Sequence, residues 1–281
     1  MKPFPLKTLA TGAIAALLSQ LAIAVPVAPP GDLATWTATG TWGSAGADGD
    51  ITLSPLGNAR YGYVSTANSE AFGVSPLSLP SNNKGFETNV STIVSGSFSA
   101  GAADRLSMFF NYVSTDGKGY DDYAWARLVN ADTNALVTWL FTARSTNSGP
   151  KNVVPGDVLD NSVFDPKDVI VNFKDRNFTD KTVNWSPLGF SNNQCWEENA
   201  PGCGFTGWME SGYTFAQGGN FKVEIGVTNW GDTAYDSGLA FDFANLTHTQ
   251  AASPAPVPEP ETYALMLAGL GLLAIVRRRR K

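Results

Sequence analysis

The sequence predicts an all-β protein, a jelly-roll-like antiparallel β-sandwich formed by residues 25–246. Apolar and polar residues alternate in several short segments, which is the period of a strand with one buried face. Glycine, serine, threonine and asparagine gather between those segments, and long stretches with the 3.6-residue period of a helix are absent. Many short strands separated by turns are typical of a sandwich, and roughly 230 residues suffice for one large domain or two small ones.

Six segments are expected to be strands. The clearest is 221–227, in which every second residue from Phe221 to Val227 is apolar. The other five are rich in aromatic and branched residues; they are 105–113, 123–130, 135–143, 169–173 and 239–246. The step Ala131-Asp132-Thr133-Asn134 predicts a hairpin turn between two of them. Residues 146–168, rich in proline, asparagine and aspartate, are expected to be an excursion at one sheet edge and not a domain boundary.

The amino-terminal end has the pattern of a secretory signal peptide, residues 1–24. Lys2 and Lys7 precede an apolar stretch over residues 9–18, and the small-residue step Ala22-Ile23-Ala24 follows. An amphipathic first helix is the alternative, but the stretch has no polar face to turn toward water. The body is therefore expected to be exported.

The carboxyl-terminal end predicts a flexible spacer followed by a short transmembrane helix. Residues 247–260 alternate alanine, proline and serine, whose small side chains offer little apolar surface for packing. Residues 263–276 carry no charge and as a helix would measure roughly 21 Å, short of the ~30 Å hydrocarbon layer. Tyr263 at one interface and the terminal arginines at the other would make so short a span tolerable.

Residues 257–281 resemble the PEP-CTERM sorting signal of Gram-negative bacteria. The likeness lies in a Pro-Glu-Pro step, an apolar segment and a terminal basic cluster, namely Pro258, Glu259, Pro260, Arg277, Arg278, Arg279 and Arg280. The resemblance implies processing by an exosortase-type membrane protease and a transient membrane anchor. It further implies a place at the cell surface or in the extracellular matrix, in association with biofilm polysaccharide.

The charge balance narrows the classes of ligand. The chain has 25 acidic and 19 basic side chains, for a net charge of −6, and both ends hold several of the basic ones. An acidic body without a basic stripe argues against nucleic acid, because phosphates require lysine and arginine. Divalent cations and neutral glycans suit it better.

Cys195 and Cys203 are the only cysteines. In an exported protein, a close and even pair predicts a disulfide, and closing so short a loop should contribute about 2–3 kcal/mol to stability. A metal site would need further soft ligands, and no histidine lies nearby.

Two loops combine glycine with closely spaced carboxylates. Residues 114–123 contain Asp116, Asp121 and Asp122, and residues 228–238 contain Asp232 and Asp236. Carboxylate oxygens of this kind are ligands for Ca²⁺, so Ca²⁺ is the candidate cofactor and these five aspartates are its candidate ligands. The alternative is that these aspartates cap turns through their own backbone, and the sequence leaves both open.

The second loop also carries a resemblance. The step Gly231-Asp232-Thr233-Ala234-Tyr235-Asp236-Ser237-Gly238 is similar to the GD-x-x-YDSG step of choice-of-anchor β-sandwich domains, in which an earlier aspartate-rich loop precedes an aromatic strand. The resemblance implies a surface-exposed, lectin-like sandwich.

Eight tryptophans and eight tyrosines favour a sugar ligand, because sugar rings stack on aromatic faces. Trp196 and Trp208, beside the cysteine pair, and Trp230, in the second acidic loop, are the candidate ligand-binding residues. Trp125 and Trp139 fall on expected strands and are therefore assigned to the core.

Catalysis has little support in the sequence. The single histidine, His248, lies in the expected spacer, which argues against schemes that need a histidine base or ligand. A glycosidase needs only two carboxylates, for which the candidates are Glu197, Glu198, Glu210 and Glu224. We therefore expect a non-catalytic matrix protein that binds exopolysaccharide, with an adhesive protein lacking a sugar site, or a glycoside-active enzyme, as alternatives.

Overall fold

The computed structural model describes residues 33–69, 85–116, 120–145, 169–173, 182–196 and 203–243. The expected signal peptide, the spacer, the transmembrane segment 263–276 and the excursion 146–168 lie outside these residues. Within them, no helix is both long and apolar enough to cross a bilayer.

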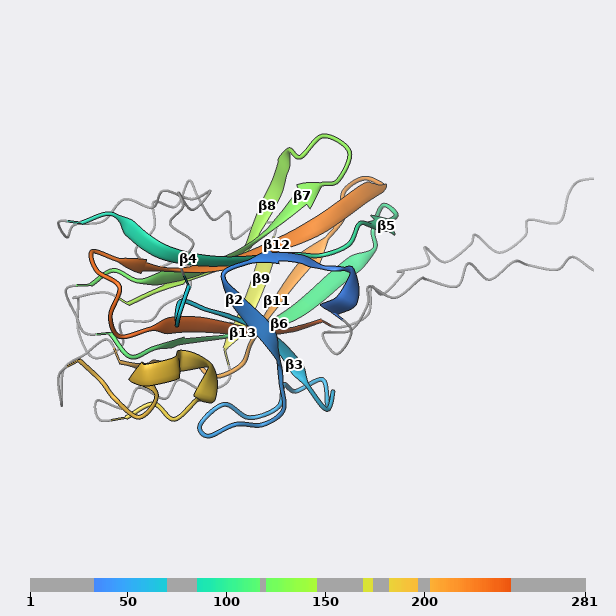
Figure 1. The fold of residues 1–281 in the computed structure, drawn as a ribbon. Coiled ribbons are helices and arrows are strands. Elements are labelled where there is room, and N and C mark those ends of the chain that lie inside the picture. Colours follow the sequence, from blue (N-terminus) through green and yellow to red (C-terminus); the bar gives the residue numbers. More distant parts are fainter. Residues whose placement is uncertain are drawn as a thin grey trace, which may run out of the picture.

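Two antiparallel sheets pack face to face as a sandwich, with the sheet nearer the top of Figure 1 called sheet A and the other sheet B. Sheet A runs in the order β1 (Thr37–Thr39), β4 (Glu87–Val94), β12 (Gly219–Trp230), β7 (Tyr123–Asn130) and β8 (Leu136–Arg144), and β5 (Phe98–Ala100) pairs with β12. Sheet B runs β2 (Thr41–Ala45), β3 (Tyr61–Ser65), β13 (Ser237–Phe243), β6 (Arg105–Ser114), β11 (Met209–Thr214) and β9 (Val169–Phe173), and β10 (Gly204–Phe205) pairs with β6.

The six expected strands are confirmed as β6, β7, β8, β9, β12 and β13. The last begins two residues earlier than expected, at Ser237, and residues 244–246 lie outside the described part. The hairpin is also confirmed: Asn130 accepts hydrogen bonds from the N–H groups of Asp132 (3.0 Å) and Thr133 (2.9 Å), and Asn134 takes the positive φ of 58° that closes the turn. The strands before residue 105 were not expected, and neither were β10 and β11.

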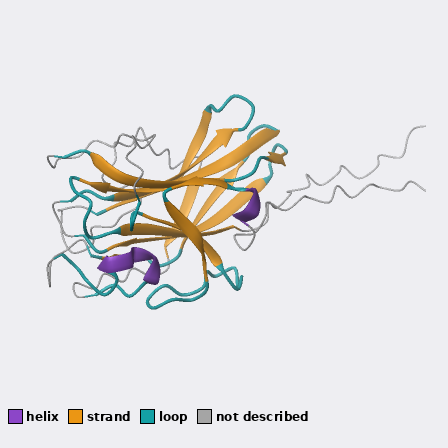
Figure 2. Cartoon of the chain, viewed as in Figure 1, coloured by secondary structure: helices purple, strands orange, loops and turns teal. Residues whose placement is uncertain are grey.

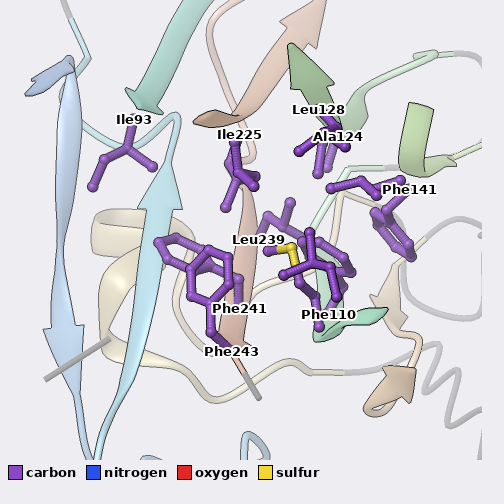
Figure 3. Close-up of a cluster of buried hydrophobic side chains, with 14 of the residues drawn as sticks. Ile93, Phe110, Ala124, Leu128, Phe141, Ile225, Leu239, Phe241 and Phe243 are labelled. Atoms are coloured by element: carbon purple, nitrogen blue, oxygen red, sulfur yellow. The ribbon is translucent and has the colours of Figure 1, made fainter. Parts of the chain in front are cut away.

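The principal core lies between the sheets. Val223, Ile225 and Val227 on β12 are fully buried at the two-residue spacing of one strand face. Figure 3 shows Ile225 of sheet A above Leu239 and Phe241 of sheet B. Phe110 of sheet B stacks on Phe141 of sheet A with ring centroids 4.8 Å apart, so aromatic contacts also join the two layers.

A second apolar cluster covers the outer face of sheet B. It joins residues of sheet B to the segment around the short helix η2 (Ser186–Ser191), and its largest fully buried side chain is Trp185. The Trp185 indole donates a hydrogen bond to the hydroxyl of Tyr61 on β3 (2.9 Å), and Leu188 is buried beside it. In Figure 2, η2 lies at one end of the sandwich and the other short helix, η1 (Leu33–Thr35), lies at the opposite end.

Candidate functional site

A cleft of about 490 Å³ opens at the end of the sandwich where η2 lies. Four segments form it: the turn after β3, strand β4, the end of η2, and the loop between β12 and β13. The lining includes the side chains of Asn68, Asn89, Phe190, Gln194, Tyr235 and Asp236. Residues that lie more than 100 positions apart in the sequence therefore meet at one site.

Phe190 stands at the edge of this cleft with 90% of its surface exposed. The preceding Gly189 has a φ of +56°, a conformation that favours glycine, and a Cβ there would lie 3.1 Å from the side chain of Ala67. Leu188, one residue earlier, is buried, and the Ser65 hydroxyl donates to the Pro187 carbonyl (2.6 Å). The backbone of η2 is thus fixed on sheet B, while the Phe190 ring faces solvent.

Asp236 ties together three of these segments, namely its own loop, η2 and the turn after β3. Its carboxylate accepts hydrogen bonds from Ser191 (2.9 Å) and Thr66 (3.1 Å). Its carbonyl oxygen accepts from both the N–H (3.1 Å) and the hydroxyl (2.8 Å) of Thr115. Burial raises the pKa of Asp236, and the two hydroxyl bonds to the charged form oppose that rise. Asp236 therefore acts as a structural cross-link of the cleft.

The next two residues complete the Asp-Ser-Gly step. Ser237 donates to the Asp122 carboxylate (2.8 Å), which joins β13 to the first acidic loop. At Gly238 a Cβ would overlap the Trp185 ring and lie 3.2 Å from the Val64 carbonyl oxygen. The motif thus has a packing explanation, because each of its residues fixes the position of a neighbouring segment.

An aromatic group made of Tyr120, Trp196 and Tyr235 adjoins the cleft. Trp196 meets Tyr235 and Tyr120 edge to face, with ring centroids 5.3 and 5.8 Å apart, and 43% of Trp196 is exposed. The Trp196 N–H donates to the Thr115 carbonyl (3.1 Å). Tyr235 lines the cleft, so the aromatic surface continues from the cleft onto Trp196.

Cys195 and Cys203 form a disulfide, the pairing that the sequence predicts. Cys203 is buried in the second apolar cluster, against which Cys195 also packs. The bond therefore holds the segment bearing Trp196 to the outer layer of sheet B.

The five candidate metal ligands do not converge in a single group. Among the described residues, no three or more acidic, cysteine or histidine side chains are placed to hold an ion. Asp116, Asp121 and Asp122 are buried, whereas Asp232 is half-buried and caps its own turn by accepting from the Ala234 N–H (2.8 Å). The carboxylates of Asp122 and Asp236 accept the hydrogen bonds given above.

One of the three tryptophan candidates is wrong. Trp208 is only 8% exposed, packs edge to face on Tyr61 (5.5 Å), and donates its indole N–H to the Thr52 carbonyl (2.9 Å). It belongs to the second apolar cluster, which a sequence pattern does not reveal. Trp230 is half-buried, with the Arg144 guanidinium 5.8 Å from its ring centroid. Trp196 is the exposed candidate.

The candidate glutamates that the structure describes lie on different sheets. Glu210 of β11 accepts from Ser107 (2.7 Å) on sheet B, and Glu224 of β12 forms an ion pair with Arg127 (2.6 Å) on sheet A. They do not form the facing carboxyl pair of a glycosidase. Glu197 and Glu198 lie outside the described residues.

The sequence did not identify Phe190, Asn68, Asn89 or Gln194 as site residues. Asn89 lies in an Asn-Val-Ser step, which has the pattern of a glycosylation acceptor and not of a ligand site. The others belong to no recognisable motif, and a lone phenylalanine in a loop is ordinarily expected to be buried. The only local signal is Gly189, whose position before an aromatic residue predicts a turn without indicating which way the ring points.

Comparison with known proteins adds one firm result. Residues 256–281 match the PEP-CTERM protein-sorting motif. No curated protein sequence matches the chain.

Two solved structures show a faint similarity. One is the K3 cleaved adhesin domain of Lys-gingipain from Porphyromonas gingivalis w83, with 10% identity, 73% of this chain and 90% of that chain covered, and a TM-score of 0.29. The other is a family 11 carbohydrate-binding module from Clostridium thermocellum in complex with a β-1,3-1,4-mixed-linked tetrasaccharide, with 11% identity, 69% and 88% coverage, and a TM-score of 0.17. At these scores neither bears on the function of this chain.

Proposed function

We propose that this chain is a non-catalytic protein of the cell surface or extracellular matrix that binds extracellular polysaccharide and is processed by an exosortase-type enzyme. The PEP-CTERM motif at residues 256–281 marks it for export and for sorting at the membrane or surface. The observation that carries the sugar ligand is the partly exposed aromatic group Tyr120, Trp196 and Tyr235, which continues into an open cleft.

The chemistry of these surfaces supports the proposal of a sugar ligand. A pyranose ring has an apolar C–H face that packs on an aromatic ring, while its hydroxyls need donors and acceptors at the edge. Trp196 supplies exposed aromatic surface, and the adjoining cleft supplies amide and hydroxyl groups. The non-catalytic assignment is supported by the separation of Glu210 and Glu224 on different sheets.

The experiment is retention on polysaccharide. The full chain, kept in a detergent without sugar groups, is incubated with insoluble and soluble polysaccharides, and the bound fraction is measured. Retention that free oligosaccharide competes away supports the proposal. Failure to bind any polysaccharide, together with binding to a protein partner, would instead identify an adhesive protein without a sugar site.

A further inference from the structure

We infer that the cleft at η2 is the primary binding site for an uncharged polysaccharide. A sugar ring stacks on Phe190, and the side-chain amides of Asn68 and Gln194 form hydrogen bonds with the sugar hydroxyls. This inference rests on the proposed function and specifies its ligand class and its site. Phe190, Asn68 and Gln194 all line the cleft.

The charge of the cleft selects against ionic polymers. Among the cleft-lining residues that the structure describes, Asp236 carries the only carboxylic acid, and none is a lysine, an arginine or a histidine. The Asp236 carboxylate already accepts hydrogen bonds from Ser191 and Thr66. A polymer with carboxylates or sulfates would find no counter-charge, and desolvating its anions there would be unfavourable. Uncharged hydroxyls meet no such penalty.

The polar groups of the cleft match hydroxyls. A side-chain amide offers both donors and an acceptor, as does a sugar hydroxyl. Asn68 and Gln194 are exposed, and their amides make no hydrogen bond within the part of the chain that the structure describes. Asn89, by contrast, is buried and donates to the Thr66 carbonyl (2.8 Å). It therefore fixes the turn after β3 that lines the cleft.

The platform is organised before the ligand arrives. Leu188 and Trp185 anchor η2 in the second apolar cluster, and Ser191 is bonded to Asp236. Phe190 is thereby held at the edge of the cleft with 90% of its surface exposed. Because the backbone that carries Phe190 is already fixed, only the side-chain torsions of its ring have to be ordered when a sugar stacks on it. The cleft volume of about 490 Å³ lies in the range of ordinary ligand sites.

Trp196 provides a second contact for a longer chain. Tyr235 lines the cleft and also packs on Trp196. A polysaccharide that stacks on Phe190 therefore meets further aromatic surface beyond the cleft, and a ligand of several sugar units is favoured over a monosaccharide.

The test is affinity electrophoresis of the full chain through gels that contain dextran, galactomannan, xyloglucan or the polyanion alginate. We expect at least one uncharged polymer to retard the wild type and alginate to have no effect. Phe190→Ala should weaken retardation about tenfold, as for loss of a central aromatic contact, and Gln194→Ala should weaken it about threefold. Trp42→Ala is the matched control, since Trp42 is exposed but lies outside the cleft.

The outcomes separate the two proposals. If the wild type binds an uncharged polymer and Phe190→Ala binds equally well, the cleft is not the site, although polysaccharide binding stands. If alginate alone retards the protein, the assignment to uncharged ligands is overturned. If no polymer retards it, the proposed function itself fails. Because Phe190 is exposed, its variant should melt close to the wild type, and a melting curve checks that it is folded.

Discussion

Asp122 is a fully buried carboxylate that links the two sheets. One oxygen accepts from the Trp230 N–H of β12 (2.8 Å), and the other accepts from the Ser237 hydroxyl of β13 (2.8 Å). Burial raises the pKa of Asp122 well above its ordinary value, the negative charges of Asp232 and Asp236 raise it further, and the two hydrogen bonds oppose the rise. This residue should therefore contribute to the pH dependence of stability.

The direction in which stability changes with pH follows from the linkage between proton binding and folding. Because the folded pKa lies above the unfolded one, the folded protein binds the proton more tightly. The contribution of Asp122 to stability is fully present below pH 3.8, the ordinary value, and is lost as the pH rises through the folded pKa. The free energy of unfolding, measured by urea titration between pH 4 and 8, should decline with pH.

The variant Asp122→Asn should make that decline shallower, since the amide cannot ionise but its oxygen can still accept from Trp230. Burial raises the pKa of Asp236 and Asp242 in the same direction, so some decline should remain. An unchanged slope in the variant would contradict this assignment.

Calcium binding by the aspartates of the two acidic loops remains a prediction. Metal that binds only the folded state must raise its stability by mass action, by about 2.7 kcal/mol at a hundred times the dissociation constant. If the acidic loops bind Ca²⁺, the melting temperature should be higher in millimolar Ca²⁺ than in EDTA, with Mg²⁺ as the control. Equal melting temperatures in Ca²⁺ and EDTA would remove calcium from the account.

At the scale of elements, the contact between β13 and η2 positions the cleft. Gly238 faces the Trp185 ring, and an added methyl group would overlap that ring and approach the Val64 carbonyl. We expect Gly238→Ala to lower the free energy of unfolding by about 1–3 kcal/mol, as overpacking does, and to weaken glycan retention because η2 must move. Gly46→Ala is the control, since its Cβ would meet nothing closer than 3.8 Å.

The disulfide provides a second prediction at this scale. Cys195 adjoins Trp196, and its bond to Cys203 fixes that segment on the outer layer of sheet B. The double variant Cys195→Ser with Cys203→Ser should lose about 2–3 kcal/mol of stability, the value for so short a loop. A reductant should lower the melting temperature of the wild type and leave that of the double variant unchanged. A wild type insensitive to reductant would refute the structural role.

At the scale of the whole molecule, the cleft and the first and last described residues, Leu33 and Phe243, lie at opposite ends of the sandwich. β13 begins at Ser237, beside the cleft, and ends at Phe243. Its seven residues span roughly 20 Å at the usual rise of a strand. Trp36, near the start of the described chain, packs on Phe243 with ring centroids 5.1 Å apart. Both chain exits therefore lie at the end away from η2 (Figure 1).

This arrangement predicts that anchoring through the carboxyl-terminal end leaves the cleft accessible. The chain immobilised on a surface through a tag after Lys281 should bind polysaccharide with the affinity measured in solution. Attachment through a cysteine introduced at Thr233, which lines the cleft, should block binding. Equal binding in the two orientations would contradict this placement of the site.

The sequence alone determined the features that depend on local order. Strands β6 to β9, β12 and β13 follow from alternation and β-branched or aromatic composition, because a strand face repeats every two residues. The cysteine spacing predicted the disulfide, and the terminal pattern predicted the sorting motif. Strands β1, β2, β3, β5 and β10 were missed, since segments of two to five residues carry too little periodicity. The longer strands β4 and β11 were also missed, because polar residues and glycine fill most of their positions and leave little apolar alternation.

Only the tertiary structure decided which side chains are exposed and which meet. Trp208 and Trp196 lie near the same cysteine pair, yet Trp208 is buried against sheet B and Trp196 faces solvent. Asn68, Phe190 and Tyr235 converge because β3, η2 and β13 are neighbours in space. The physical reason is that a loop side chain is buried only where its loop packs on a sheet. The face of that sheet is built from strands that lie far apart in the sequence.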